Sequence, residues 1–174
     1  MSMPELIPVL SKNEIKKTVQ NLGTAISSDY KNGQIVMIGV LKGAFIFMAD
    51  LVRQLSIPVQ TDFICASSYG DKACSSGKVN FSKKIDIDVV DKDVIIVEDI
   101  VDTGLTLIYL IDYVKSLGAK SVKICALIDK QERREIDIEI DYAGHSIEEG
   151  FLVGYGLDYA EDYRNLPEIF NLKL

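Results

Sequence analysis

The chain has 174 residues, of which 48% are hydrophobic and only four are proline, so it has enough apolar material for one domain spanning residues 1–174. Its 26 acidic and 19 basic residues give a net charge of −7, which disfavours nucleic-acid binding through a broad basic face. No apolar run approaches the ~18 residues of a membrane span, and no basic segment followed by an apolar core begins the chain. We therefore expect a cytoplasmic protein that binds neither nucleic acid nor membranes.

The three cysteines do not indicate a disulfide framework or a zinc site. Cys65, Cys74 and Cys125 are odd in number, widely spaced and without a histidine-rich context. We expect buried or incidental thiols.

Helical and strand patterns alternate along the chain. Ser11 and Glu14 form a capping box before an amphipathic helix that ends near Gly33, and a mostly apolar helix is expected over residues 44–55. Strands are expected at residues 35–40, 61–69, 94–98, 122–128 and 151–155. This alternation predicts an α/β fold with a mostly parallel, twisted sheet flanked by helices.

The segment 94–106, with the sequence VIIVEDIVDTGLT, is the most informative part of the chain. Its first four residues form an unbroken apolar run, which is typical of a parallel strand covered on both faces. Glu98 and Asp99 follow at the carboxyl end of this strand, where ligands bind in open α/β sheets. A pair of carboxylates there could hold vicinal hydroxyls or a divalent cation.

The next residues, Asp102-Thr103-Gly104-Leu105-Thr106, open an apolar helix that runs to about Leu117. Exposed amides and the helix dipole make such a helix start an anion site, and Gly104 permits close backbone approach. Acids that bind hydroxyls next to a phosphate site describe a ribose 5-phosphate site. The alternative is that Asp102 only caps the helix and the other acids are solvated.

Lys42 and Gly43 lie at another strand-to-helix turn, which indicates a second anion site. An ordinary turn with a surface lysine is the alternative. Residues 70–84 are polar, contain glycines and lack periodicity, so we expect a long loop, either a lid over the site or a segment without a role.

The motif VEDIVDTGLT closely resembles the phosphoribosyl pyrophosphate (PRPP) signature of type I phosphoribosyltransferases. About nine tenths of the chain, from near Pro8 to Leu166, resembles the bacterial hypoxanthine and hypoxanthine-guanine members of that family. The resemblance implies the type I fold, with a small hood over the base formed by the N-terminal segment and roughly residues 129–174. It also implies a homodimer or homotetramer.

The resemblance assigns the residues that bind PRPP. LKGAFIFMADL resembles the pyrophosphate loop of the family, in which Lys42 and Gly43 contact pyrophosphate and the peptide bond before the lysine is often cis. Arg164 corresponds to an arginine that reaches pyrophosphate, and Ser68-Tyr69 to a pair that closes over PRPP. The 5-phosphate would be bound by the turn that contains Asp102, Thr103, Gly104, Leu105, Thr106 and Leu107.

The resemblance likewise assigns the metal and base sites. Glu98, Asp99 and Asp158 match the acidic ligands of ribose hydroxyls and Mg²⁺. Phe151 would stack on the purine, the carbonyl of Leu152 would meet its edge, and Lys130 would donate to a 6-oxo group. These matches mark hypoxanthine or guanine as the base that accepts phosphoribose, with IMP or GMP and pyrophosphate as products.

In the implied mechanism, departure of pyrophosphate runs ahead of attack, so positive charge develops on the ribose while Mg²⁺ and Lys42 neutralise the leaving group. Asp102 matches the family's proposed base, which accepts the N7 proton of the purine as N9 bonds.

Two alternatives remain. One is an enzyme of this fold that prefers xanthine or a pyrimidine, and the other is a regulatory protein that binds PRPP without catalysis. Two segments also depart from the family pattern. GHSIEEGF replaces the more common GFEIPDKF, which makes His145 a loop residue rather than a catalyst, and Gln131 replaces a common proline.

Overall fold

The computed structural model describes residues 4–67 and 80–173, which form two sheets and three helices. The larger sheet has six strands in the order β4-β3-β2-β5-β6-β7. Its members are β2 (Ile35–Leu41), β3 (Val59–Ser67), β4 (Asn80–Lys83), β5 (Asp93–Val101), β6 (Ser121–Lys130) and β7 (Tyr142–Ile147). All neighbours are parallel except the β3–β4 pair, which confirms the predicted mostly parallel sheet.

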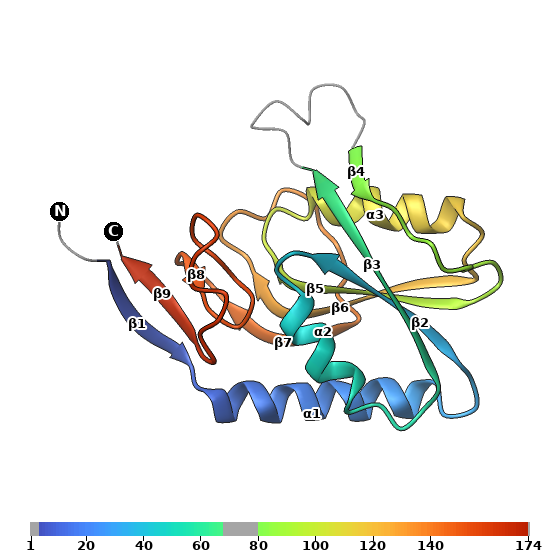
Figure 1. The fold of residues 1–174 in the computed structure, drawn as a ribbon, viewed down its shortest axis with the longest axis horizontal. Coiled ribbons are helices and arrows are strands. Elements are labelled where there is room, and N and C mark those ends of the chain that lie inside the picture. Colours follow the sequence, from blue (N-terminus) through green and yellow to red (C-terminus); the bar gives the residue numbers. More distant parts are fainter. Residues whose placement is uncertain (1–3, 68–79, 174) are drawn as a thin grey trace.

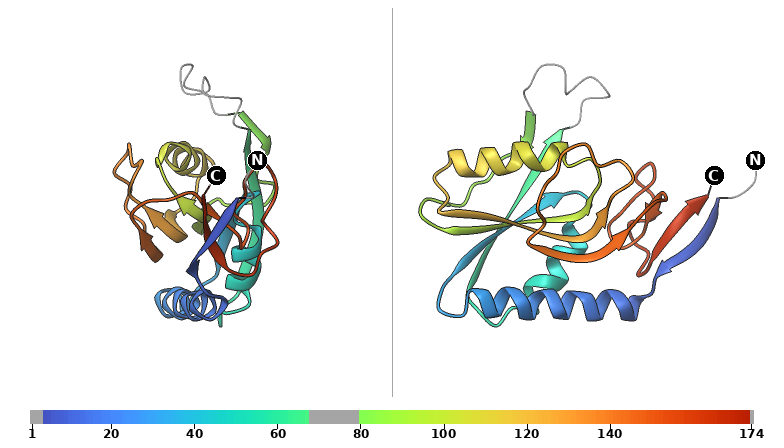
Figure 2. Two further views of the ribbon diagram at one scale, coloured as in Figure 1. Left: turned by 90° about the vertical axis from the view of Figure 1, so that its left-hand side faces the viewer. Right: turned by 180° about the vertical axis from the view of Figure 1, so that it is seen from behind.

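Helices cover both faces of this sheet, as the unbroken apolar strands predicted. The helices α1 (Lys12–Asp29) and α2 (Phe45–Val52) pack on one face, against side chains such as Met37 and Ile95. The helix α3 (Leu105–Ser116) packs on the other face, against Ile38 and Ile96. Figures 1 and 2 show α1 and α3 on opposite sides of the sheet.

The start of α1 confirms the predicted capping box. Ser11 Oγ accepts a hydrogen bond from the backbone amide of Glu14 at 3.3 Å, and the Glu14 carboxylate accepts one from the Ser11 amide at 2.8 Å. These two bonds satisfy amides that the helix itself leaves unpaired. The helix ends at Asp29, about one turn earlier than expected.

A second, antiparallel sheet joins the two ends of the described chain. It contains β1 (Glu5–Leu10), β9 (Ile169–Lys173) and β8 (Leu152–Val153) in the order β1-β9-β8. Figure 1 shows β1 and β9 side by side at one end of the molecule. Only β8 was expected, and it is shorter than the predicted strand 151–155.

Two other expectations about loops were wrong. Residues 80–83 were predicted to belong to a long loop but form β4, which pairs with β3 along the edge of the sheet. His145 was predicted in a loop but lies in β7, opposite Ile128 of β6, and its Nε2 is 2.7 Å from Thr18 Oγ1. Ser68 and Tyr69 lie outside the described residues, as does most of the predicted lid.

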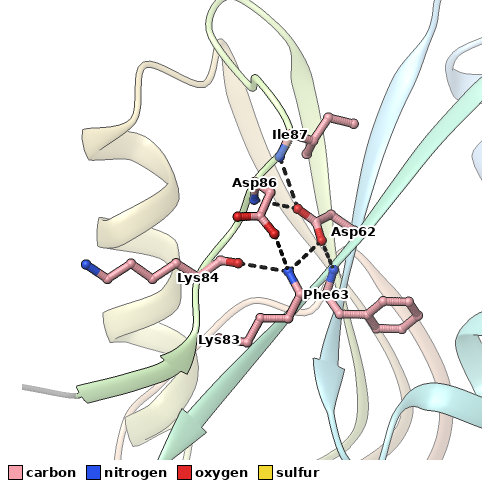
Figure 3. Close-up of polar contacts among 6 residues, drawn as sticks. All are labelled: Asp62, Phe63, Lys83, Lys84, Asp86 and Ile87. Atoms are coloured by element: carbon pink, nitrogen blue, oxygen red, sulfur yellow. Dashed lines mark hydrogen bonds and ion pairs between the residues drawn. The ribbon is translucent and has the colours of Figure 1, made fainter.

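A polar cluster ties β4 and the segment after it to β3 (Figure 3). The carboxylate of Asp62 accepts hydrogen bonds from Lys83 Nζ at 2.9 Å and from the amides of Phe63, Asp86 and Ile87 at 2.7, 2.7 and 3.1 Å. Asp62 therefore joins β3, which precedes residues 68–79, to β4 and the segment 84–87, which follow them.

Two further findings concern the sequence predictions. Cys65 and Cys125 are free thiols, while Cys74 lies outside the described residues. Among the helices of the described chain, none is long and apolar enough to cross a membrane.

Candidate active site

A cavity of about 310 Å³ lies where β5 leads into α3. Its polar lining includes Glu98, Asp99, Asp102 and Thr103, and Gly104, Thr106 and Leu107 also contribute. A larger cavity of about 410 Å³ lies between α1, α2 and residues 155–167, but no predicted site residue lines it. We place the candidate site in the smaller cavity because its lining carries the three predicted carboxylates and the turn before α3.

Glu98 and Asp99 are the sixth and seventh of the nine residues of β5, so this carboxylate pair lies within the strand rather than after its end. Asp99 is buried, with 7% of its surface exposed, and its Oδ1 accepts a hydrogen bond from the Ile100 amide at 2.8 Å. Burial and the adjacent Asp99 charge raise the pKa of Glu98 well above its usual range, and burial also raises the pKa of Asp99. Both shifts disfavour two negative charges side by side, so a proton or a bound cation would stabilise the pair.

The turn before α3 has the geometry of an anion site. Gly104 precedes the first residue of the helix with φ +84°, in the left-handed region that glycine adopts without strain, and no side chain caps the helix. The first amides of the helix have no partners within it. Thr103 Oγ1 accepts a hydrogen bond from the Leu105 amide at 3.3 Å, which fixes the turn.

Asp102 has one carboxylate oxygen without a partner. Its Oδ2 lies 3.6 Å from Arg133 Nη1, whereas its Oδ1 is buried and accepts no hydrogen bond from the described residues. Because buried polar atoms are nearly always paired, this oxygen is suited to accept a proton or a hydrogen bond from a ligand.

Arg134 connects Asp102 to Lys130 and was not predicted. Its Nε donates to the Asp102 carbonyl at 2.8 Å, and its Nη2 donates to the carbonyls of Val101 at 3.0 Å and Lys130 at 3.2 Å. It also forms an ion pair with Asp129. A largely buried guanidinium therefore holds the end of β6 against the turn that carries Asp102.

The predicted base-binding residues lie around Glu132. Lys130, the last residue of β6, is buried and its Nζ lies 2.9 Å from Glu132 Oε2. Glu132 also accepts a hydrogen bond from the Gly150 amide at 3.4 Å, next to Phe151. The Phe151 ring is half exposed and meets the ring of Tyr159 edge to face at 5.5 Å between centroids, while Leu152 is buried in β8.

Gly43 lies against the carboxylate of Asp99. The Leu41–Lys42 peptide bond is cis, as the resemblance implied. A Cβ at Gly43 would collide with the Asp99 carboxylate, and a Cβ at Gly156 would collide with the Gly43 carbonyl. The close approach of these backbones requires glycine at both positions.

The other charged groups of this region come from the turn 156–164. Arg164 Nη1 donates to the Gly156 carbonyl at 2.8 Å, and Arg164 Nη2 lies 2.8 Å from Asp158 Oδ1. Lys42 Nζ pairs with Glu161 Oε2 at 3.0 Å. The turn therefore places Asp158, Glu161 and Arg164 beside Lys42.

The three predicted metal ligands do not converge. Within residues 4–67 and 80–173, no group of three His, Cys, Asp or Glu side chains is close enough to hold a metal ion. Glu98 and Asp99 line the cavity, whereas Asp158 is paired with Arg164. The donor set still fits Mg²⁺, which is usually held by one or two carboxylates together with water and substrate phosphates.

The structure thus brings most of the predicted residues to one edge of the sheet. Glu132, Arg134 and Glu161 were missed, although each is charged and close in sequence to a predicted residue. The run DKQERR after β6 signalled a charged segment but not which side chain turns inward.

A comparison against protein-family models agrees with this fold. The model described as the phosphoribosyl transferase domain matches residues 9–160, which is most of the chain. The chain belongs to the phosphoribosyltransferase family.

Individual relatives narrow this assignment. The chain is 47% identical over 165 residues to the hypoxanthine-guanine phosphoribosyltransferase of Bacillus subtilis (strain 168), covering 95% of this chain and 92% of that protein. The hypoxanthine phosphoribosyltransferase of Buchnera aphidicola subsp. Schizaphis graminum (strain Sg) is 45% identical over 163 residues, covering 92% of each. A hypoxanthine-guanine phosphoribosyltransferase crystal structure from Bacillus anthracis matches with a TM-score of 0.91 and 45% identity, over 96% of this chain and 99% of that one. Within the family, the chain therefore groups with the hypoxanthine-guanine phosphoribosyltransferases, which confirms the resemblance.

Proposed function

We propose that the protein catalyses transfer of the 5-phosphoribosyl group from PRPP to N9 of hypoxanthine or guanine in purine salvage, giving IMP or GMP and pyrophosphate. The observation that carries this proposal is one cavity lined by the carboxylates of Glu98 and Asp99, by the start of α3 and by Asp102, whose Oδ1 has no partner among the described residues. Together these groups suit ribose hydroxyls, a 5-phosphate and a proton on the base.

PRPP binds along the edge of the sheet. The turn from Asp102 to Leu107 donates amides and hydroxyls to the 5-phosphate, while Glu98 and Asp99 accept hydrogen bonds from the ribose hydroxyls. Lys42, the Gly43 amide and Arg164 bind pyrophosphate, and Ser68 and Tyr69 close over PRPP.

Mg²⁺ held by Glu98, Asp99 and Asp158 through water or directly would neutralise charge on the leaving pyrophosphate. Burial raises the pKa values of both carboxylates, and a cation bound there would favour their ionised forms.

The base lies between Phe151 and the end of β6. Lys130 donates to the 6-oxo group, which disfavours adenine because its 6-amino group would meet another donor. The Leu152 carbonyl accepts from the purine edge. Asp102 accepts the N7 proton through Oδ1 as the N9 bond forms, and Arg134 holds its backbone in place.

Three further parts of the proposal concern organisation. The small sheet with residues 129–174 forms the hood over the base, the chain assembles as a homodimer or homotetramer, and it acts in the cytoplasm. Light scattering on the purified protein tests the assembly, and a mass of one chain would contradict it.

The proposed activity is tested by pyrophosphate release from PRPP and Mg²⁺ with hypoxanthine, guanine, xanthine, adenine and uracil offered separately. Release with hypoxanthine or guanine supports the proposal. Release only with xanthine or uracil would reassign the base, and PRPP binding without release would indicate a regulator.

A pair of lysine variants sharpens this test. Lys130→Met should abolish most release, whereas Lys123→Met should not. Lys123 lies on the same strand, but its ammonium lies over the rings of Tyr30 and Tyr142, at 5.6 and 5.3 Å from their centroids, away from the cavity.

A further inference from the structure

A single carboxylate lies between two of the cations assigned to pyrophosphate. Glu161 Oε2 is 3.0 Å from Lys42 Nζ and 3.3 Å from Arg164 Nη2. Lys42 and Arg164 are far apart in sequence, and Glu161 joins them. We propose that Glu161 occupies the pyrophosphate position between these cations and weakens pyrophosphate binding by competing for them, an inference that rests on the proposed function.

The turn that presents Glu161 is fixed by its own contacts. Asp158 Oδ2 accepts a hydrogen bond from the Glu161 amide at 2.9 Å, and Asp158 Oδ1 pairs with Arg164 at 2.8 Å. Ala160, Glu161 and Tyr163 have φ values of 50°, 72° and 75°, in the left-handed region that side chains disfavour. Such a conformation persists only where the surroundings hold it, so the position of Glu161 is built into the fold.

The ion pair between Lys42 and Glu161 is weak enough for a ligand to displace it. The Lys42 and Glu161 side chains are 62% and 63% exposed, and exposed pairs of this kind contribute little net free energy. Pyrophosphate carries more negative charge than one carboxylate and can bind Mg²⁺ as well, so it replaces Glu161 at both cations.

Glu161 therefore acts through Lys42 and Arg164 as a positioning residue that favours release of the product. Without it, Lys42 would lose its carboxylate partner and Arg164 would keep only Asp158, so both cations would bind pyrophosphate more tightly and the leaving group would dissociate more slowly. Product release limits turnover in many enzymes, so a built-in competitor for the same cations has a direct use.

The test is calorimetric titration of the full chain with pyrophosphate in the presence of Mg²⁺. Glu161→Gln should lower the dissociation constant of magnesium pyrophosphate about 2- to 5-fold, the range expected when an exposed competing pair is removed. The KM for PRPP should fall in parallel, with the KM for the base unchanged. A residue with only a structural role would weaken binding or leave it alone.

Asp162→Asn is the matched control, because Asp162 is exposed and its side chain makes no hydrogen bond or ion pair with the rest of the described chain. It removes the same charge one residue away. Equal effects of the two variants, or weaker binding in Glu161→Gln, would overturn the inference. If the wild-type protein does not bind magnesium pyrophosphate but still transfers phosphoribose, the assignment of Lys42 and Arg164 fails, and this inference fails with it.

Discussion

The Asp62 cluster beside β4 gives a prediction whose size follows from the structure. Asp62→Asn keeps the shape of the side chain but removes the charge that Lys83 and three backbone amides face (Figure 3). Burial opposes ionisation of Asp62, but the hydrogen bond from Lys83 and those from the amides outweigh it and lower its pKa from 3.8 to about 2.

That shift sets the expected loss of stability. At 1.36 kcal/mol per pKa unit, the ionised form of Asp62 stabilises the folded state by about 2 to 3 kcal/mol relative to the neutral form. Asp62→Asn should therefore lower the free energy of unfolding by about that amount at pH 7, or the melting temperature by about 4 to 12 °C for a chain of this size.

Urea unfolding at several pH values measures this loss. Since the folded pKa lies below the unfolded value, the stabilisation is complete above pH 3.8 and disappears as the pH falls to about 2, so the difference between wild type and variant should shrink over that interval. Asp86→Asn is the control, because Asp86 also pairs with Lys83, at 3.1 Å, but its side chain is 86% exposed. Equal losses in the two variants, or a difference that is undiminished at pH 2, would refute the reasoning.

Three other variants test the candidate site. Asp102→Asn should lower kcat about 10²- to 10⁴-fold, the usual contribution of a general base, with PRPP affinity kept in titrations; unchanged turnover would remove Asp102 from this role. Gly43→Ala should weaken binding of PRPP with Mg²⁺ about tenfold or more, because the added Cβ collides with the Asp99 carboxylate. Arg134→Met should destabilise the fold by about 1.5 to 3 kcal/mol in urea unfolding and lower kcat, since it removes the ion pair with Asp129 and the hydrogen bonds to the Asp102, Val101 and Lys130 carbonyls. The matched variant Arg133→Gln should cost less than about 1 kcal/mol, because Arg133 is 66% exposed and 3.6 Å from its partner, and equal costs would contradict the distinction.

The central sheet and the carboxylate pair were predictable because both have local signals. An apolar run such as that of β5 must be covered on both faces, which implies helices on both sides and a parallel sheet. The carboxyl ends of parallel strands lie at one edge of the sheet. Glu98 and Asp99 near that end of β5 and the glycine turn before α3 were therefore expected to lie close together, as they do. The register of β5 placed the acids within the strand, which periodicity alone does not resolve.

The small sheet and the edge strands could not be predicted, because their stability comes from distant partners. β1 and β9 lie near opposite ends of the described chain, and no local pattern in either segment encodes their pairing. β4 has the sequence NFSK, whose polar residues suit an edge strand but give no apolar alternation. His145 was misplaced for the same reason: β7 is defined by its pairing with β6.

The residues missed at the site show a further limit of sequence reasoning. Arg133 and Arg134 are identical in type and adjacent, yet one is mostly exposed and the other joins the turn of Asp102 to the end of β6. Their difference is set by the direction of the chain after β6, which no local pattern encodes. Glu161 is a similar case, because its only ion-pair partners in the described chain are Lys42, 119 positions away, and Arg164. Groups that act by holding or competing for other side chains therefore emerge only from the three-dimensional contacts, whereas groups that contact ligands directly sit in recognisable motifs.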